Sequence, residues 1–294
     1  MQSSSNAHSR AAVTPGFSSP EPHDIPFTDV IRATGTRPAL FGVFPAPPGG
    51  REFVDMLPLD QPVYDLYFSK LSSDASFPTT EQLAIDFLRD IRKIQAHGPY
   101  QILGYSNAGL LAYEVARLLT EQGEEVTLLA LIDTWHPEFV RNLPKPQLIK
   151  YRGMRYLDRL KKYARFLRSG RVDDLLGGLQ EFLGKRVKGL VWRLNGLLFR
   201  RANQPAPASM KNIEVNSVLS GFSPRPYAKR FLLIRPDDPV DKKLKDKTVG
   251  WHVCATAGVE VQFLQAEHGQ MMNRPQVRVV MDEIIPRLAG SPGS

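Results

Sequence analysis

The sequence predicts an α/β protein with a mostly parallel central sheet, helices on both faces of the sheet and one helical insertion. Strand-like apolar runs alternate with helical patterns between residues 35 and 140. Residues 141–211 interrupt this alternation with two amphipathic helical patterns, and the alternation resumes over residues 212–290. We therefore expect one sheet-containing core, built from two stretches of chain, with the insertion between them.

The expected strands are short apolar runs that end at turn residues or at polar side chains. In chain order they are residues 39–45, 62–68, 100–106, 125–134, 230–238 and 259–269. The run 125–134 is almost continuously apolar, which is typical of a central parallel strand covered on both faces. Functional groups of such sheets gather at the carboxyl ends of the strands, so the polar residues at these ends are candidates for a site.

The expected helices of the core are residues 79–96, 107–123 and 276–288, each with apolar side chains at helical spacing. The first of them opens with Thr79 and, three residues later, Gln82. This pair predicts a capping box, in which the threonine side chain accepts a hydrogen bond from the first turn of the helix.

Positive charge is concentrated in the insertion. Residues 141–211 hold 18 Lys and Arg against four acidic residues, a net charge of +14, whereas the whole chain has +8. The simplest interpretation of this charge is that it forms the solvated faces of two amphipathic helices. The alternatives are attraction of an acidic partner and contact with a membrane surface. Nucleic acid is disfavoured, because no recognition motif accompanies the charge.

Composition limits the class of protein. The chain has 294 residues, 42% hydrophobic and 23% charged, and no apolar stretch approaches the roughly 18 residues of a transmembrane helix. Residues 1–34 are rich in Ser, Pro and Ala and predict a disordered leader or linker rather than a secretory signal. A single cysteine, Cys254, excludes an internal disulfide and a cysteine-based metal site, and we interpret it as a small buried hydrophobe. We expect no stable membrane insertion and a cytoplasmic location.

Ser106 stands at a strand-to-helix turn with the sequence Gly-Tyr-Ser-Asn-Ala-Gly, residues 104–109. A nucleophilic serine is often lifted above a sheet on such a turn, where the N–H of the next residue, here Asn107, points into the site. Serine is also a common helix N-cap, so this motif alone is weak evidence. The usual pattern has glycine at the position of Ala108, and we expect the alanine to strain the turn.

A serine nucleophile needs a histidine base and an acid that orients the histidine. His268 follows the last apolar strand in a glycine-flanked loop, which makes it the best of the six histidines for the base. Asp133 ends the strand after the Ser106 helix, while Asp237 and Asp238 end the next-to-last strand. Spacing alone leaves the choice of acid open.

These motifs resemble the thioesterase domains of non-ribosomal peptide and polyketide synthases, which have the α/β-hydrolase fold. The segment GPYQILGYSNAGLLAYEVARLLTEQGEEVTLLALIDT is similar to their turn, helix and acid-bearing strand. The segment around Glu267-His268, Pro275 and Val277 resembles their terminal histidine motif. The resemblance, from about Arg37 to Leu288, implies Ser106, Asp133 and His268 as the catalytic triad, with Asp237 or Asp238 as the alternative acid.

The resemblance also implies a function. Ser106 would take an acyl, peptidyl or polyketide chain from the phosphopantetheine thioester of a carrier protein, and water or a group of the chain itself would release it. The insertion would be a basic helical lid that faces the carrier protein or upstream synthase module. No cofactor is implied beyond the phosphopantetheine of the substrate. The alternatives are a free-standing editing thioesterase, an acyltransferase with the same triad, and an inactive protein that binds a carrier or an acyl ligand.

The expected oxyanion loop departs from the family pattern, because the segment FPAPPGG is longer and richer in proline. Pro47 and Pro48 have no N–H to donate. The expected donors of the oxyanion hole are therefore the backbone N–H groups of Asn107 and Ala46.

Overall fold

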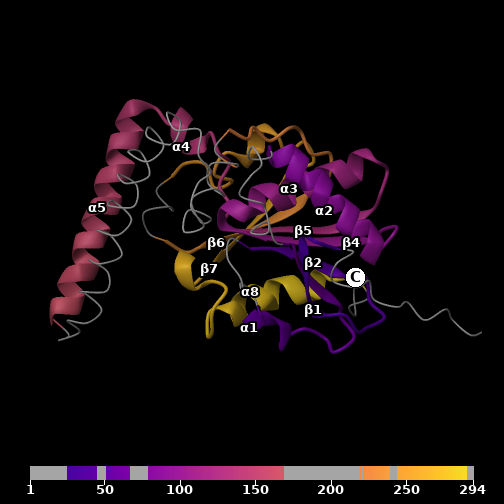
Figure 1. Cartoon of the computed structure of the whole chain (residues 1–294). Coiled ribbons are helices and arrows are strands. Elements are labelled where there is room, and N and C mark those ends of the chain that lie inside the picture. The colour runs from indigo at the N-terminus through magenta and orange to yellow at the C-terminus, as the bar shows by residue number, and fades with distance from the viewer. Residues whose placement is uncertain are drawn as a thin grey trace, which may run out of the picture.

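The computed structural model describes residues 25–44, 51–66, 79–168, 219, 221–238 and 244–289. The described chain contains a seven-stranded sheet in the order β1-β3-β2-β4-β5-β6-β7. β1 pairs antiparallel with β3, and the other five neighbouring pairs are parallel. The prediction of a mostly parallel sheet is confirmed (Figure 1).

The strands lie within or beside the apolar runs from which they were predicted, apart from β1. They are β1 Thr28–Arg32, β2 Leu40–Val43, β3 Val63–Leu66, β4 Tyr100–Tyr105, β5 Val126–Ile132, β6 Phe231–Pro236 and β7 Val259–Leu264. The helices are α1 Arg51–Val54, α2 Thr80–Ile94, α3 Gly109–Glu121, α4 Phe139–Asn142, α5 Lys145–Arg168 and α8 Val277–Ile284. Single 3₁₀ turns lie at Ser106–Ala108, Trp251–Val253, His268–Gln270 and Ile285–Arg287.

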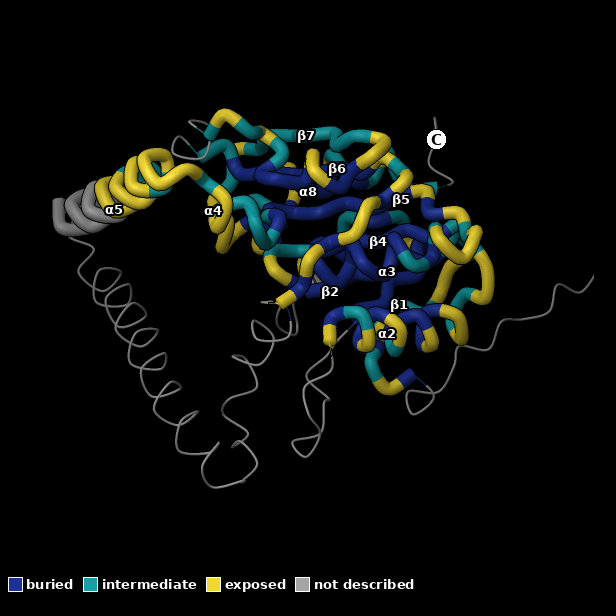
Figure 2. The backbone as a smooth tube through the Cα atoms, turned by 90° about the horizontal axis from the view of Figure 1, so that it is seen from above, coloured by how far each residue is buried: buried dark blue, intermediate teal, exposed yellow. Residues whose placement is uncertain are grey.

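Helices cover both faces of the sheet. α2 and α3 lie on one face and α1 and α8 on the other (Figure 1). Each side has its own apolar cluster, one containing Phe87 and Leu111 and the other containing Phe53 and Met281. The central strands are dark blue, that is buried, in Figure 2, whereas every residue of the edge strand β7 is partly exposed. This layered core fixes the carboxyl ends of β4, β5, β6 and β7, where the site lies.

The start of α2 follows the predicted capping chemistry. Thr79 precedes the helix in an extended conformation, and its Oγ1 accepts a hydrogen bond from the backbone N–H of Gln82 at 3.2 Å. Such a bond satisfies one of the free N–H groups at a helix start.

The expected leader is too long at its carboxyl end. Residues 28–32, placed in the leader by composition, form β1 on the edge of the sheet. Two hydrogen bonds hold the entry to this strand, because the buried Asp90 of α2 accepts from the backbone N–H of Phe27 at 2.7 Å and from the hydroxyl of Thr28 at 3.1 Å. The strand has only two strongly apolar side chains, so its sequence gives little strand signal. Residues 1–24 lie outside the described chain.

Part of the insertion is described. α5 is the first of the two predicted helices, and it extends away from the sheet at one side of the molecule (Figures 1 and 2). The exposed side chains of α5 include Lys145, Lys150 and Arg152, together with Ile149, which is 71% exposed. The second expected helix of the insertion lies outside the described residues. Within the described ranges, no helix is long and apolar enough to span a membrane.

Candidate active site

Ser106 occupies a strained turn between β4 and α3. Its φ is +55°, in the left-handed region that non-glycine residues seldom adopt and that costs of order 1–3 kcal/mol. The turn brings strand and helix very close together. A Cβ atom on Gly104 would lie 2.5 Å from the Cα of Gly109, and one on Gly109 would lie 2.0 Å from Oγ1 of Thr134. Both glycines are therefore required by packing.

Ala108 is not strained, contrary to the sequence expectation. Its φ and ψ are −65° and −20°, ordinary right-handed helical values, and its methyl group is fully buried. The strain of the turn lies instead at Ser106. The close approach that glycine permits occurs one residue later, at Gly109, so the shifted glycine of this sequence stands where the packing needs it.

Three of the predicted site residues lie in one hydrogen-bonded line. Ser106 Oγ lies 3.2 Å from Nε2 of His268, and Nδ1 of the same imidazole lies 2.6 Å from Oδ2 of Asp133. They come from the carboxyl ends of β4, β7 and β5, which meet at one edge of a parallel sheet. The Asp133 side chain is 6% exposed and that of His268 50% exposed. The Asp133 carboxylate is therefore shielded from water, whereas the imidazole is half exposed.

The two alternative acids lie one strand away, after β6. Asp237 accepts a hydrogen bond from the side-chain amide of Gln265, and its backbone N–H donates to the carbonyl of Leu264 at 2.7 Å. The carboxylate on the imidazole of His268 is that of Asp133, which itself has a positive φ of 43°. The geometry favours Asp133, the acid that the family resemblance implies.

Tyr105, the residue before Ser106, holds His268 in two ways that the sequence did not suggest. Its hydroxyl donates to the backbone carbonyl of His268, and its ring stacks on the imidazole with 5.5 Å between the centroids and 27° between the planes. Burial, together with the nearby charge of Asp133, raises the pKa of Tyr105 to about 12. The hydroxyl therefore remains a donor throughout the neutral pH range.

Thr134 and Trp135, directly after Asp133, also contact the line of three. Thr134 Oγ1 donates to the backbone carbonyl of Ser106 at 2.9 Å. The indole N–H of Trp135 donates to Oδ1 of Asp133 at 3.0 Å. No periodicity or spacing marks either residue in the sequence, because their role depends on how β5 ends beside β4.

Of the two expected oxyanion donors, the structure describes Asn107 but not Ala46. Asn107 lies beside Ser106 in the 3₁₀ turn Ser106–Ala108, which leads into α3. This position suits an N–H aimed at an anion. Ala46 lies outside the described residues, as do Pro47 and Pro48.

Reactive and metal-binding side chains elsewhere in the described ranges form no second site. Within the described ranges, no three His, Cys, Asp or Glu side chains are grouped so as to hold a metal ion. Cys254 is 3% exposed, which confirms its expected place in the core, and burial raises the pKa of its thiol. Neither observation adds a reactive centre to the serine site.

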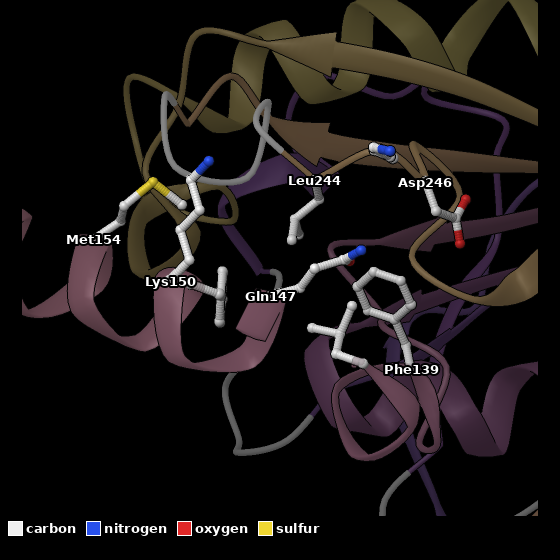
Figure 3. Close-up of a pocket in the computed structure, with 9 residues that line it drawn as sticks. Phe139, Gln147, Lys150, Met154, Leu244 and Asp246 are labelled. Carbon is white, nitrogen blue, oxygen red and sulfur yellow. The ribbon is translucent and has the colours of Figure 1, made fainter. Parts of the chain in front are cut away.

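A cavity of about 200 Å³ lies between the insertion and the body of the molecule. In Figure 3, Gln147, Lys150 and Met154 on α5 face Leu244 and Asp246 on the opposite segment. Its apolar lining consists of Phe139, Leu143, Tyr151, Met154 and Leu244. Trp135 packs on two of these, with ring centroids 5.8 Å from Phe139 and 6.0 Å from Tyr151. The residue that contacts the acid therefore also contacts the wall of the cavity.

Comparison with known proteins shows similarity to thioesterase domains. The family model described as "Thioesterase domain" matches residues 52–160, a range that contains Ser106 and Asp133. The resemblance to thioesterase domains is confirmed. The matched range is less than half of this chain.

The relatives of this thioesterase-like chain are large synthases. Malpinin synthetase of Mortierella alpina is 39% identical over 108 residues, which are 35% of this chain and 1% of the synthetase. A non-reducing polyketide synthase of Pseudevernia furfuracea is 38% identical over 121 residues, which are 40% of this chain and 6% of the synthase. The chain thus spans only a small part of the curated relatives that it matches.

A solved structure shares the fold. The NocB thioesterase domain, crystallised as a covalent complex with a fluorophosphonate nocardicin G analogue, aligns with a TM-score of 0.54 at 18% identity. The alignment covers 89% of this chain and 99% of that domain. The α/β-hydrolase fold expected from the resemblance is therefore confirmed.

Proposed function

We propose that this chain releases an acyl, peptidyl or polyketide chain from the phosphopantetheine thioester of a carrier protein, through an acyl–Ser106 intermediate. The observation that carries the proposal is the hydrogen-bonded line from Ser106 through His268 to the shielded Asp133. In a fold shared with thioesterase domains, this line supplies a nucleophile, a base and an orienting acid.

In the first half-reaction, Ser106 Oγ attacks the thioester carbon while Nε2 of His268 takes the hydroxyl proton. Asp133 accepts the Nδ1 proton in a hydrogen bond and stabilises the imidazolium that forms. The carbon–sulfur bond then breaks, and His268 gives its proton to the departing thiolate. The products are a free phosphopantetheine thiol and an ester on Ser106.

In the second half-reaction, His268 takes a proton from the acceptor as the acceptor attacks the ester carbon. The same proton is then returned to Ser106 Oγ. Water as the acceptor gives a free acid, and an amine or hydroxyl of the bound chain gives a ring. In both half-reactions the negative carbonyl oxygen is bound by the N–H groups of Asn107 and Ala46. Losing one such donor typically costs about 10²–10³ in rate.

The cavity beside α5 and the charge of the insertion support the proposed substrate and partner. The cavity beside α5 has an apolar lining suited to an acyl chain, and Lys150 at its edge adds a positive charge (Figure 3). The basic insertion suits an acidic carrier protein that presents the phosphate of its pantetheine arm. We propose a carrier protein or upstream synthase module as the partner in a cytoplasmic setting. In this proposal the pantetheine arm enters as part of the substrate.

Labelling with a fluorophosphonate probe tests the proposal. We expect one probe per chain on Ser106 and none in Ser106→Ala, together with hydrolysis of a short acyl thioester that the same substitution abolishes. A folded chain that is neither labelled nor active would instead favour a protein that only binds a carrier or acyl ligand.

Product analysis separates the reaction types. Free acid from a carrier-bound chain indicates hydrolysis, and preferential release of short or incorrect chains indicates an editing enzyme. A cyclic product or transfer to an added amine indicates a macrocyclase or an acyltransferase with the same triad.

A further inference from the structure

Trp135 and His268 bind opposite oxygens of the same carboxylate. The indole N–H of Trp135 donates to Oδ1 of Asp133 at 3.0 Å, while Nδ1 of His268 lies 2.6 Å from Oδ2. The carboxylate is nearly excluded from water. A carboxylate held through one oxygen can rotate about its Cβ–Cγ bond, whereas one held through both oxygens has its plane fixed. The second contact therefore determines the direction in which Oδ2 points.

Trp135 is itself held firmly in place. The guanidinium of Arg235, at the carboxyl end of β6, lies 5.7 Å from the centroid of its ring system, within cation–π range. Arg235 is fully buried and donates through Nη1 to the carbonyl of Lys247 at 3.0 Å. Phe139 meets the indole edge-on at an interplanar angle of 75°, and Tyr151 of α5 packs beside it. A cation over the ring also draws electron density from it, which makes the N–H a stronger donor.

We propose that Trp135 is a positioning residue for the reaction, which acts through Asp133 to aim the imidazole of His268 at Ser106. Arg235 supports it by fixing and polarising the indole. The proposal deepens the proposed function and rests on it, because it requires the line of three to be catalytic. It assigns the indole N–H a role in turnover rather than in substrate binding.

Trp135→Phe tests the role of the N–H with a short acyl thioester as substrate. We expect kcat to fall about 10-fold or more, the loss expected for one hydrogen bond to a charged group, with KM changed less than 2-fold. The rate of labelling by a fluorophosphonate should fall in parallel, because that reaction needs an activated Ser106 and no carrier protein. The low-field proton resonance of His268 Nδ1–H should move upfield and exchange faster with water.

Trp251→Phe is the matched control. Trp251 is also buried and donates its indole N–H, at 2.8 Å, but to the backbone carbonyl of Thr134 rather than to the acid. We expect this variant to lose stability while its kcat stays within about 2-fold of wild type and its low-field resonance stays in place. Equal losses of kcat in the two variants would reduce Trp135 to a structural role and overturn the proposal.

A second replacement at position 135 covers the case in which the phenylalanine variant does not fold. Benzothienylalanine keeps the shape of the indole but has no N–H, so the protein should fold and reproduce the loss of kcat. Wild-type kcat in this protein would overturn the role of Trp135 and leave the proposed function standing. A wild-type chain without thioesterase activity would instead overturn the proposed function itself.

Discussion

Tyr105 shows how one side chain can fix both the backbone and the ring of a candidate base. Its hydroxyl binds the carbonyl of His268 and its ring stacks on the imidazole, so rotation of the histidine loop breaks both contacts. Tyr105 immediately precedes the residue that the imidazole must reach. At the scale of single residues, the site thus depends on side chains that do no chemistry themselves.

Tyr105→Phe should lower kcat on a small thioester about 3- to 10-fold, the loss expected for one neutral hydrogen bond. The pKa of about 12 means that Tyr105 stays protonated below roughly pH 11, so the ratio of wild-type to variant kcat should be constant from pH 6 to pH 9. Tyr105→Leu also removes the stacking and should cost more. Equal activity of the phenylalanine variant and wild type would show that the hydroxyl contact has no role in turnover.

The sequence alone could not decide which aspartate is the acid of the site. Asp133 and Asp237 both follow parallel strands, so their spacing from His268 could not separate them. The contacts that separate them, from His268 to Asp133 and from Gln265 to Asp237, depend on loop conformations that have no sequence period. Trp135 and Tyr105 were missed for the same reason. From the sequence, an aromatic residue beside the end of a strand is interpreted first as part of the hydrophobic core.

The strand–turn–helix element from β4 to α3 explains how alanine can stand where the family pattern has glycine. Ala108 is helical and buried, while Ser106 carries the positive φ and Gly109 makes the close contact with Thr134. The requirement for small residues is therefore met at Gly104 and Gly109. The sequence pattern located the turn correctly but assigned its strain to the wrong residue.

Ala108→Gly should leave kcat unchanged and lower the free energy of unfolding by about 0.5–1 kcal/mol, because glycine has more conformational freedom to lose at a helical position. Urea denaturation and thioester turnover measure the two effects. Gly109→Ala is the contrasting change and should abolish activity, since its Cβ would collide with the Thr134 hydroxyl. A rise in kcat for Ala108→Gly would mean that the native turn is impaired after all.

Among the larger elements, β1 was the one that composition placed wrongly. Its strand signal is weak, and it is held by long-range hydrogen bonds to Asp90 rather than by an apolar run. The central strands β4 to β6 are buried on both faces and were predictable because burial requires a continuous apolar sequence. In this fold, the buried strands could therefore be predicted from the sequence, whereas the edge strand β1 could not.

At the scale of the whole molecule, the insertion and the rest of the chain carry opposite net charges. Residues outside 141–211 hold 20 basic and 26 acidic side chains, whereas α5, which extends from one side of the body, contains nine Lys and Arg and one Asp. An acidic carrier protein approaching this side would be steered toward the edge of the sheet that holds Ser106. The charge should therefore affect the binding of the carrier protein rather than the rate of the chemical step.

The double variant Lys145→Glu/Arg152→Glu, on exposed positions of α5, should raise KM for a carrier-bound thioester several-fold at low salt. Turnover of a small soluble thioester should be unchanged. Arg89→Glu/Arg230→Glu alters the net charge equally on α2 and before β6 and should leave both KM values unchanged. Equal losses on the two substrates for the α5 variant would exclude a docking role for these charges.

In the proposed reaction, Ser106 carries the acyl chain between the two half-reactions. Rapid quenching of the chain with a slowly hydrolysed acyl thioester, followed by intact and peptide mass spectrometry, tests it directly. We predict a mass increase of one acyl group on the peptide that contains Ser106, which forms in wild type, builds up slowly in His268→Ala and is absent from Ser106→Ala. Turnover of the thioester without any acylated peptide, or acylation at another residue, would rule out an acyl–Ser106 intermediate.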